Sequence, residues 1–236
     1  MKPQQEKPTA FDDFAGNYAE LIKDPIRDKF AATGDFFFKR KVQVILGFFR
    51  KAGIQSEKLD WLDIGCGQGD MLRAGLPFFR SSTGCDPSKG MLQACTGLQV
   101  RAQESLEQLP FDDASFDFLT AVCVYHHVPV DGRLQLTMEA LRALKPGRTF
   151  CIIEHNPWNI ATRVIVSRTP VDADANLLTP RETRRLLSNA GAKVLGTRYF
   201  LLLPQMIYSY FRPIEEGLET FPLGGQYAVF AQKPSP

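Results

Sequence analysis

The sequence predicts an α/β fold: a doubly wound, mostly parallel seven-stranded sheet with an antiparallel edge strand and helices on both faces. Between residues 59 and 155, short apolar runs of strand length alternate four or five times with helical segments, as in βαβ units. Beyond residue 178, a late strand, a long excursion and a final strand predict the antiparallel edge. A chain of 236 residues with 44% hydrophobic content can bury the core of one such domain.

The segment before the first strand is predicted to be helical. Residues 1–10 are polar and contain two prolines, so they predict a disordered tail and no secretory signal. Apolar side chains at helical spacing predict helix over residues 11–33, broken near Pro25. A second helix is expected over residues 36–52, with Gly53 as its stop.

The remaining elements follow in regular order. Strands are expected at residues 59–65, 82–86, 98–103, 116–124 and 149–155. Helices are expected at residues 70–79, 89–96 and 133–144, the last closed by the tripeptide "KPG". After an irregular insertion at 156–178, a helix is expected at 181–191, strands at 193–203 and 225–232, and a partly helical stretch between these strands. Residues 11–236 are thus expected to form a single domain.

Composition argues against several classes of protein. The formal net charge of +2 does not favour a nucleic-acid partner held by bulk charge. No run of 18 apolar residues exists, so no transmembrane segment is predicted. The five cysteines are scattered without a C-x-x-C pair, which predicts reduced thiols, a cytoplasmic location and no zinc site. None of these features fixes the oligomeric state.

A glycine-rich turn follows the first predicted strand in the stretch "WLDIGCGQGD". Gly65, Gly67 and Gly69 give the backbone freedom either for a tight turn or for close approach to a ligand. Asp86 ends the next strand, where a carboxylate can accept hydrogen bonds from two ribose hydroxyls. The pair of features favours a nucleotide-like ligand at the carboxyl ends of the strands.

The charges beside this turn favour a cationic ligand over a phosphate. The glycines read G-x-G-x-G instead of G-x-G-x-x-G, and Asp70 comes directly after them. A carboxylate there would repel a pyrophosphate placed on the helix N-terminus. Asp63, just before the turn, also suits a positively charged partner.

Four segments, "LDIGCGQGD", "GCDPS", "LEQLPFDDASFDFL" and "ALKPGRTFCIIEHN", occur in the order and spacing of a known family. Over roughly residues 55–156 the chain resembles class I S-adenosylmethionine-dependent methyltransferases, of a bacterial type with unassigned substrate. The resemblance implies a Rossmann-like methyltransferase fold and S-adenosylmethionine as cofactor. It implies cofactor contacts at Asp63, Gly65, Cys66, Gly67, Gly69, Asp86, Pro87, Met91, Ser105, Leu106 and Cys123.

The resemblance also implies a role for each of these positions. Asp63 and residues 65–69 would face the methionine part of the cofactor, together with the backbone of Cys123. Asp86 would accept the ribose hydroxyls. Pro87 and Met91 would lie near the adenine. Ser105 and Leu106 stand where the family often has an acid and a small residue beside the adenine edge, and Glu104 is the alternative acid.

Histidines are the predicted catalytic residues. His126, His127 and His155 all follow the fourth or fifth predicted strand, and histidine titrates near neutrality, which suits proton removal. The alternative is that they hydrogen-bond the backbone or cap a helix. Tyr125 and Glu154 are weaker candidates. "EHN" does not predict a metal site, because successive strand residues face opposite ways.

The additions around the core are expected to bind the methyl acceptor. Residues 11–52 would form a helical lid that includes Tyr18, with plain packing onto the sheet as the alternative. Residues 156–178 and 199–222 would be substrate-side additions, and Tyr125 and Trp158 are further substrate-side candidates. Their apolar and aromatic content predicts a small, apolar or aromatic acceptor, or a lipid-linked one, methylated on O or N. Peripheral contact with a membrane surface stays open.

Two other functions fit part of the pattern. A nicotinamide-dependent oxidoreductase uses a related sheet, but Asp70 and the glycine spacing argue against it. A non-catalytic cofactor-binding module would keep the same sheet. The intact Asp63, glycine turn and Asp86 argue against a domain that has lost its catalytic activity.

Overall fold

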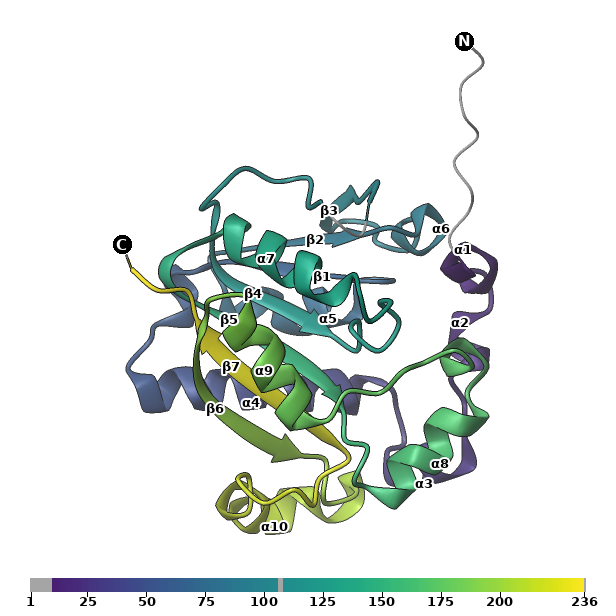
Figure 1. Cartoon of the computed structure of the whole chain (residues 1–236). Coiled ribbons are helices and arrows are strands. Elements are labelled where there is room, and N and C mark those ends of the chain that lie inside the picture. Colours follow the sequence, from purple (N-terminus) through teal and green to yellow (C-terminus); the bar gives the residue numbers. More distant parts are fainter. Residues whose placement is uncertain (1–9, 106–107, 236) are drawn as a thin grey trace.

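The computed structural model describes residues 10–105 and 108–235. Its centre is a seven-stranded sheet with the order β3-β2-β1-β4-β5-β7-β6 (Figure 1). The strands are β1 (Asp60–Ile64), β2 (Ser81–Asp86), β3 (Gln99–Ala102), β4 (Phe116–Val122), β5 (Leu144–His155), β6 (Lys193–Phe200) and β7 (Gln226–Gln232). The predicted tail at residues 1–10 lies outside the described residues except for Ala10.

Strand directions confirm the predicted fold class. The strands β1 to β5 pair in parallel, whereas β7 pairs antiparallel with both β5 and β6. The antiparallel pairing is therefore confined to one side of the sheet, where β7 is inserted between β5 and the edge strand β6. The order reverses between β1 and β4, which is where ligands bind in open α/β sheets.

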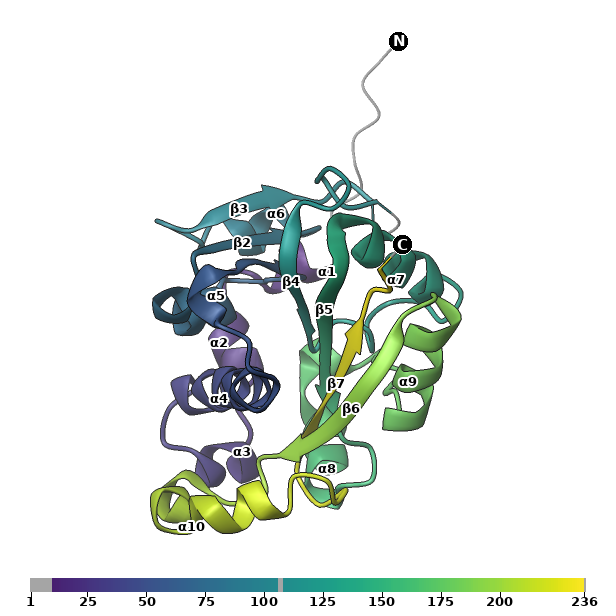
Figure 2. The ribbon, with the colours of Figure 1, turned by 90° about the vertical axis from the view of Figure 1, so that its left-hand side faces the viewer.

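Two sets of helices cover the two faces of the sheet (Figure 2). One face packs against α4 (Asp35–Ala52) and α5 (Asp70–Gly75), with Phe49 and Trp61 in its core. The other packs against α7 (Arg133–Ala143) and α9 (Pro180–Asn189). Both faces of the central strands are consequently buried, as their continuous apolar runs predict.

Shorter helices complete the molecule. The N-terminal helices are α1 (Ala10–Phe14), α2 (Tyr18–Leu21) and α3 (Pro25–Phe30). The others are α6 (Lys89–Leu92), α8 (Ile160–Arg168) and α10 (Gln205–Gly217), with 3-10 turns η1 (Ser56–Lys58), η2 (Leu76–Phe78) and η3 (Pro170–Asp172). In the described residues, no helix is long and apolar enough to cross a bilayer.

One predicted boundary is wrong. The tripeptide "KPG" was expected to lie between the helix at 133–144 and the strand at 149–155, but β5 already begins at Leu144. The strand pairs Leu144 with Phe116 and then shifts register before Phe118. Gly147 takes a φ of +73° within this irregular stretch, so a glycine typical of a turn serves here to bend a strand.

Candidate active site

A cavity of about 630 Å³ opens at the carboxyl ends of the central strands. The segments after β1, β2, β4 and β5 form one side of it. Residues of α1, α2, α3, α4 and α8 form the other side. Its volume lies in the range of small-molecule sites, and its position is where an open α/β sheet binds ligands.

The glycines of the turn after β1 differ in the space around them. A Cβ on Gly65 would lie 2.5 Å from Val124, and one on Gly69 would lie 2.4 Å from Leu98, so these two glycines are needed by the turn itself. Gly67 has a φ of +52° but has no described atom within 4 Å of where its Cβ would be. Because Gly67 also lines the cavity, its open side is available to a ligand.

Asp86 connects this turn to β2 and faces the cavity. Its Oδ2 accepts the backbone N–H of Gly67 at 2.8 Å, and its Oδ1 accepts that of Ser88 at 2.8 Å. Burial raises the pKa of Asp86, while these two donors oppose the rise. Each oxygen retains a lone pair, so the carboxylate can accept further hydrogen bonds from ligand hydroxyls.

Asp63 is a second buried carboxylate of the cavity, at the end of β1. Thr120 donates its hydroxyl to Asp63 Oδ1 at 2.6 Å, and Trp61 Nε1 in turn donates to Thr120 at 2.8 Å. Burial raises the pKa of Asp63 to about 7, with Asp86 adding to the rise and Thr120 opposing it. A cationic ligand group would relieve this cost, because it stabilises the ionised carboxylate.

Cys123 follows β4 in an unusual conformation, with a φ of +57°. Its N–H donates to the Ile153 carbonyl at 2.8 Å, and Gln226 Nε2 lies 3.4 Å from its sulfur. Burial raises the pKa of the Cys123 thiol to about 12, so the thiol is protonated and is not a nucleophile at neutral pH. A non-glycine residue at positive φ costs free energy, and such strain is typical of functional sites.

His126 is held between two carboxylates. Its Nδ1 lies 2.5 Å from Glu154 Oε2, and its Nε2 lies 3.5 Å from Asp172 Oδ1. The other oxygen of Glu154 accepts the N–H groups of Val124 and Tyr125 at 3.0 and 2.8 Å. Burial lowers the pKa of His126, but the two carboxylates outweigh it and raise the pKa to about 9. His126 is therefore charged at neutral pH and is not a general base there.

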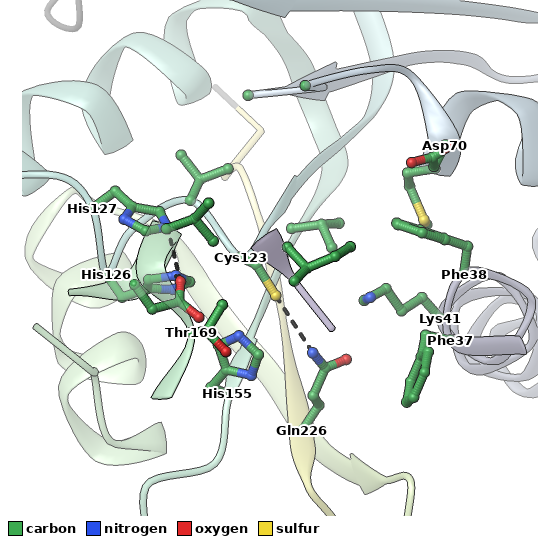
Figure 3. A pocket seen from close by; sticks show the side chains of 18 of the residues that line it. Phe37, Phe38, Lys41, Asp70, Cys123, His126, His127, His155, Thr169 and Gln226 are labelled. Carbon is green, nitrogen blue, oxygen red and sulfur yellow. Dashed lines mark hydrogen bonds and ion pairs between the residues drawn. The ribbon is translucent and has the colours of Figure 1, made fainter. Parts of the chain in front are cut away.

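The other two histidines also line the cavity (Figure 3). His127 Nε2 lies 3.4 Å from Asp172 Oδ1, and Phe11 packs edge-on against the ring of His127. Burial and the neighbouring His126 lower the pKa of His155 to about 4. His155 is thus neutral at physiological pH, and its low pKa makes it a weak proton acceptor there.

Asp172 joins His126 and His127 into a group whose ligand atoms lie within 4.8 Å of one another. Two imidazoles and a carboxylate are a donor set that suits Zn²⁺ or Fe²⁺. The sequence did not reveal this group, because Asp172 lies far from the histidines along the chain. The expectation of no metal stays a prediction.

These features can be compared with known proteins. Residues 62–152 match a family model described as a methyltransferase domain. This part of the chain is similar to methyltransferase domains. YcgJ, an uncharacterized methyltransferase of Bacillus subtilis (strain 168), is 33% identical over 102 residues, which are 40% of this chain and 40% of that protein.

Solved structures resemble the methyltransferase domain together with its additions. A chain of the complex between the Haloferax volcanii Trm112 methyltransferase activator and a methyltransferase is 20% identical, with a TM-score of 0.67 over 97% of this chain and 99% of that one. A methyltransferase of Thermotoga maritima described as S-adenosylmethionine-dependent is 20% identical, with a TM-score of 0.65 over 94% of this chain and 97% of that one. The predicted resemblance to class I methyltransferases is confirmed at the level of domain and fold.

Most of the residues predicted to bind a cofactor or to act in catalysis line the cavity at the carboxyl ends of the central strands. They are Asp63, Gly65, Cys66, Gly67, Asp86, Pro87, Met91, Cys123, His126, His127 and His155, and Tyr18 joins them from the substrate side. Leu106 lies outside the described residues.

Four predicted site residues do not line the cavity. Gly69 shapes the turn, and Ser105 forms an isolated bridge with Gln108. Tyr125 is fully buried and its hydroxyl lies 2.9 Å from Thr137 Oγ1, away from the cavity. Trp158 is 45% exposed on the surface. The strand-end position of Tyr125 did not reveal that its side chain turns into the core.

The first N-terminal helix, α1, and the residue after it contact the turn after β1 and the start of α6. Asp12 Oδ1 accepts hydrogen bonds from Ser88 Oγ at 2.7 Å and from the Gly90 N–H at 2.8 Å. Gln68, inside the glycine-rich turn, donates to the Ala15 carbonyl at 2.9 Å. These contacts attach α1 to the elements predicted to bind the cofactor. A lid function for this region stays a prediction.

The segment 199–222 was expected on the substrate side, but within it the lining residues are Leu201 and Leu202. Helix α10 instead holds α4 in place. Glu215 forms a buried ion pair with Arg40, and its Oε2 accepts the N–H groups of Leu202 and Leu203 at 3.0 and 2.8 Å. The contribution of α10 to the cavity is therefore indirect.

Several lining residues were missed by the sequence analysis. They include Lys41, Gln103, Asp172 and Gln226. Lys41 was counted within an amphipathic helix, where a lysine ordinarily faces solvent. Asp172 and Gln226 lie in segments that carry no recognised cofactor-binding motif. The packing of η3 and the pairing of β7 in the sheet bring them to the cavity.

Proposed function

We propose that this protein is an S-adenosylmethionine-dependent methyltransferase that methylates an O or N atom of a small, apolar or aromatic molecule or of a lipid-like acceptor. The observation that carries the proposal is the convergence of Asp86, the open side of Gly67 and Asp63 on one cavity. These groups suit the ribose hydroxyls, the close backbone approach and the positive charge of that cofactor.

The chain's own residues would divide the work as follows. Asp86 accepts the ribose hydroxyls, and Asp63 accepts hydrogen bonds from the methionine ammonium. The cofactor, when bound, supplies a methyl group on a positively charged sulfur. The segment after β4 brings Cys123, His126 and His127 to the cavity (Figure 3) and would position the acceptor for in-line attack.

His127 and His155 are the two candidate bases. His127 is aligned by Asp172, which also stabilises the ring when it takes up a proton. His155 is already neutral because burial lowers its pKa to about 4, and this low pKa makes it a weak base. His126, held in its charged form between Glu154 and Asp172, serves to position Asp172.

The acceptor would lie in the apolar part of the cavity. Its walls come from α3, α4, α8 and the loop after β6, and its apolar residues include Ile22, Ile26, Phe30, Phe37, Phe38, Ile165, Leu201 and Leu202. Such walls select an apolar body and leave specificity to a few polar groups. The exposed apolar residues of α10, among them Met206 and Tyr210, support contact with a lipid-like acceptor at a membrane surface.

A transfer assay with methyl-labelled S-adenosylmethionine and fractionated cell metabolites tests the proposal. We expect label in a small, apolar product, with the rate lowered about 100-fold or more when the base is removed by His127→Ala or His155→Ala. The exposed Lys39→Ala is the control. Absence of transfer with every fraction, despite tight cofactor binding, would favour a non-catalytic module.

A further inference from the structure

One cation of the cavity has no ion-pair partner among residues 10–105 and 108–235. Lys41 lies on α4, is 5% exposed and lines the cavity. Its ammonium lies 4.6 Å from the centre of the Phe38 ring. Among the described residues, none accepts a hydrogen bond from the ammonium or pairs with it. A buried charge without a partner is costly unless a ligand supplies one.

Lys41 lies at the junction between the proposed cofactor part and the proposed acceptor part of the cavity. Figure 3 shows its ammonium directed from α4 into the cavity, across from Cys123 and Gln226. Phe37 and Phe38, beside it on α4, belong to the apolar walls. Burial lowers the pKa of Lys41, whereas Cys123, Asp63 and Asp70 act against that effect. Asp63 and Cys123 lie on the proposed methionine side.

Charges around the cavity leave Lys41 as the available cation. In the described lining, four carboxylates face Arg27, Lys41 and three histidines, and of these histidines the charged His126 already pairs with Glu154 and Asp172. Arg27 already donates to the Ile22 carbonyl at 3.3 Å and lies over the Phe37 ring at 4.8 Å. Buried Gln226 Oε1, with no hydrogen-bond partner in the described structure, adds an unsatisfied polar atom to the same cavity.

We propose that Lys41 is a carboxylate-binding residue within this cavity. The ligand chemistry is a single carboxylate, because one ammonium is a compact point charge and the surrounding aspartates exclude a multiply charged anion. Two sources can supply the carboxylate. One is the methionine part of S-adenosylmethionine, an assignment that rests on the proposed function. The other is an apolar carboxylic acid that serves as the acceptor.

Lys41→Met tests the proposal, with Lys39→Met on the same helix as the matched control, since Lys39 is exposed and pairs with Asp35. Methionine keeps the length of the side chain and removes the charge. Because the substitution removes an unpaired buried charge, we expect the ligand-free variant to unfold at the same or a higher temperature than the parent. A folding defect is thereby separated from a binding defect.

The first arm compares S-adenosylmethionine with its decarboxylated analogue by calorimetry. The second compares decanoate with decanol, which share an apolar chain and differ in charge. For whichever source is correct, the parent should prefer the carboxylate by about 10- to 100-fold, and Lys41→Met should abolish that preference. Lys39→Met should retain it.

Each outcome has one meaning. Loss of preference in the first arm assigns Lys41 to the cofactor, and loss in the second assigns it to the acceptor. Unchanged preferences in both arms would overturn the proposal. Failure of the parent to bind S-adenosylmethionine would overturn the proposed function, while the decanoate arm would still decide whether Lys41 binds a carboxylate.

Discussion

At the scale of single residues, the glycines of one turn separate what the fold needs from what a ligand needs. Gly65 is confined by Val124, whereas Gly67 faces open space. The backbone freedom of glycine is therefore needed by the turn at Gly65 and is available for the approach of a ligand at Gly67.

This difference leads to a prediction for two substitutions. Gly67→Val should lower stability by about 1–2 kcal/mol, because its φ is positive, and should abolish S-adenosylhomocysteine binding because the side chain enters the cavity. Gly65→Val should unfold the protein at far lower temperature, since its Cβ meets Val124 at 2.5 Å. Thermal unfolding and calorimetry check both. Equal loss of stability in the two variants would mean that the turn alone requires the glycines.

At the scale of elements, a buried network holds α4 over the cavity. Arg40 on α4 and Glu215 on α10 are 5% and 3% exposed. Tyr208 packs against Phe36 and donates to Gln43 at 3.2 Å. Since α4 carries Phe37, Phe38 and Lys41 into the cavity, the network positions the proposed acceptor wall.

Glu215→Gln should consequently destabilise the protein by about 3 kcal/mol, because it leaves Arg40 buried without its counter-charge. The neighbouring Glu216→Gln is the control: its ion pair with Arg212 is about half exposed and is expected to contribute less than about 1 kcal/mol. Urea unfolding measures both. If the two variants lost equal stability, the Arg40–Glu215 pair would not anchor α4.

Helices and strands were easier to predict than which side chains line the cavity. Alternating apolar runs located every strand of the sheet, because period and turn residues are local properties. The turn around Asp63 and Gly67 could likewise be read from its motif. Asp172 and Lys41 could not, since their approach to the cavity depends on how η3 and α4 pack. The substrate-side role of residues 199–222 stays a prediction, because apolar composition alone does not say what a helix covers.

At the scale of the whole molecule, the Glu154–His126–Asp172 group links stability to pH. Because the folded pKa of His126 is raised to about 9 from an ordinary 6.5, its stabilisation is fully present below pH 6.5 and is lost as the pH rises through 9. We expect the free energy of unfolding to fall by roughly 1–3 kcal/mol over that interval. Urea titrations at pH 6 and pH 9 measure it, and His126→Gln should remove most of the dependence. The same slope in the variant would assign it to other groups.

The central claim is that the cavity binds S-adenosylmethionine through Asp86. Calorimetry with S-adenosylhomocysteine and with NAD, on the parent and on Asp86→Ala, tests it most directly, with exposed Asp112→Ala as the control. We expect one site for S-adenosylhomocysteine, no binding of NAD, and affinity lowered about 10- to 100-fold in Asp86→Ala, because a buried charged acceptor of ligand hydrogen bonds is lost. Equal affinity of Asp86→Ala and the parent, or binding of NAD in place of S-adenosylhomocysteine, would contradict it.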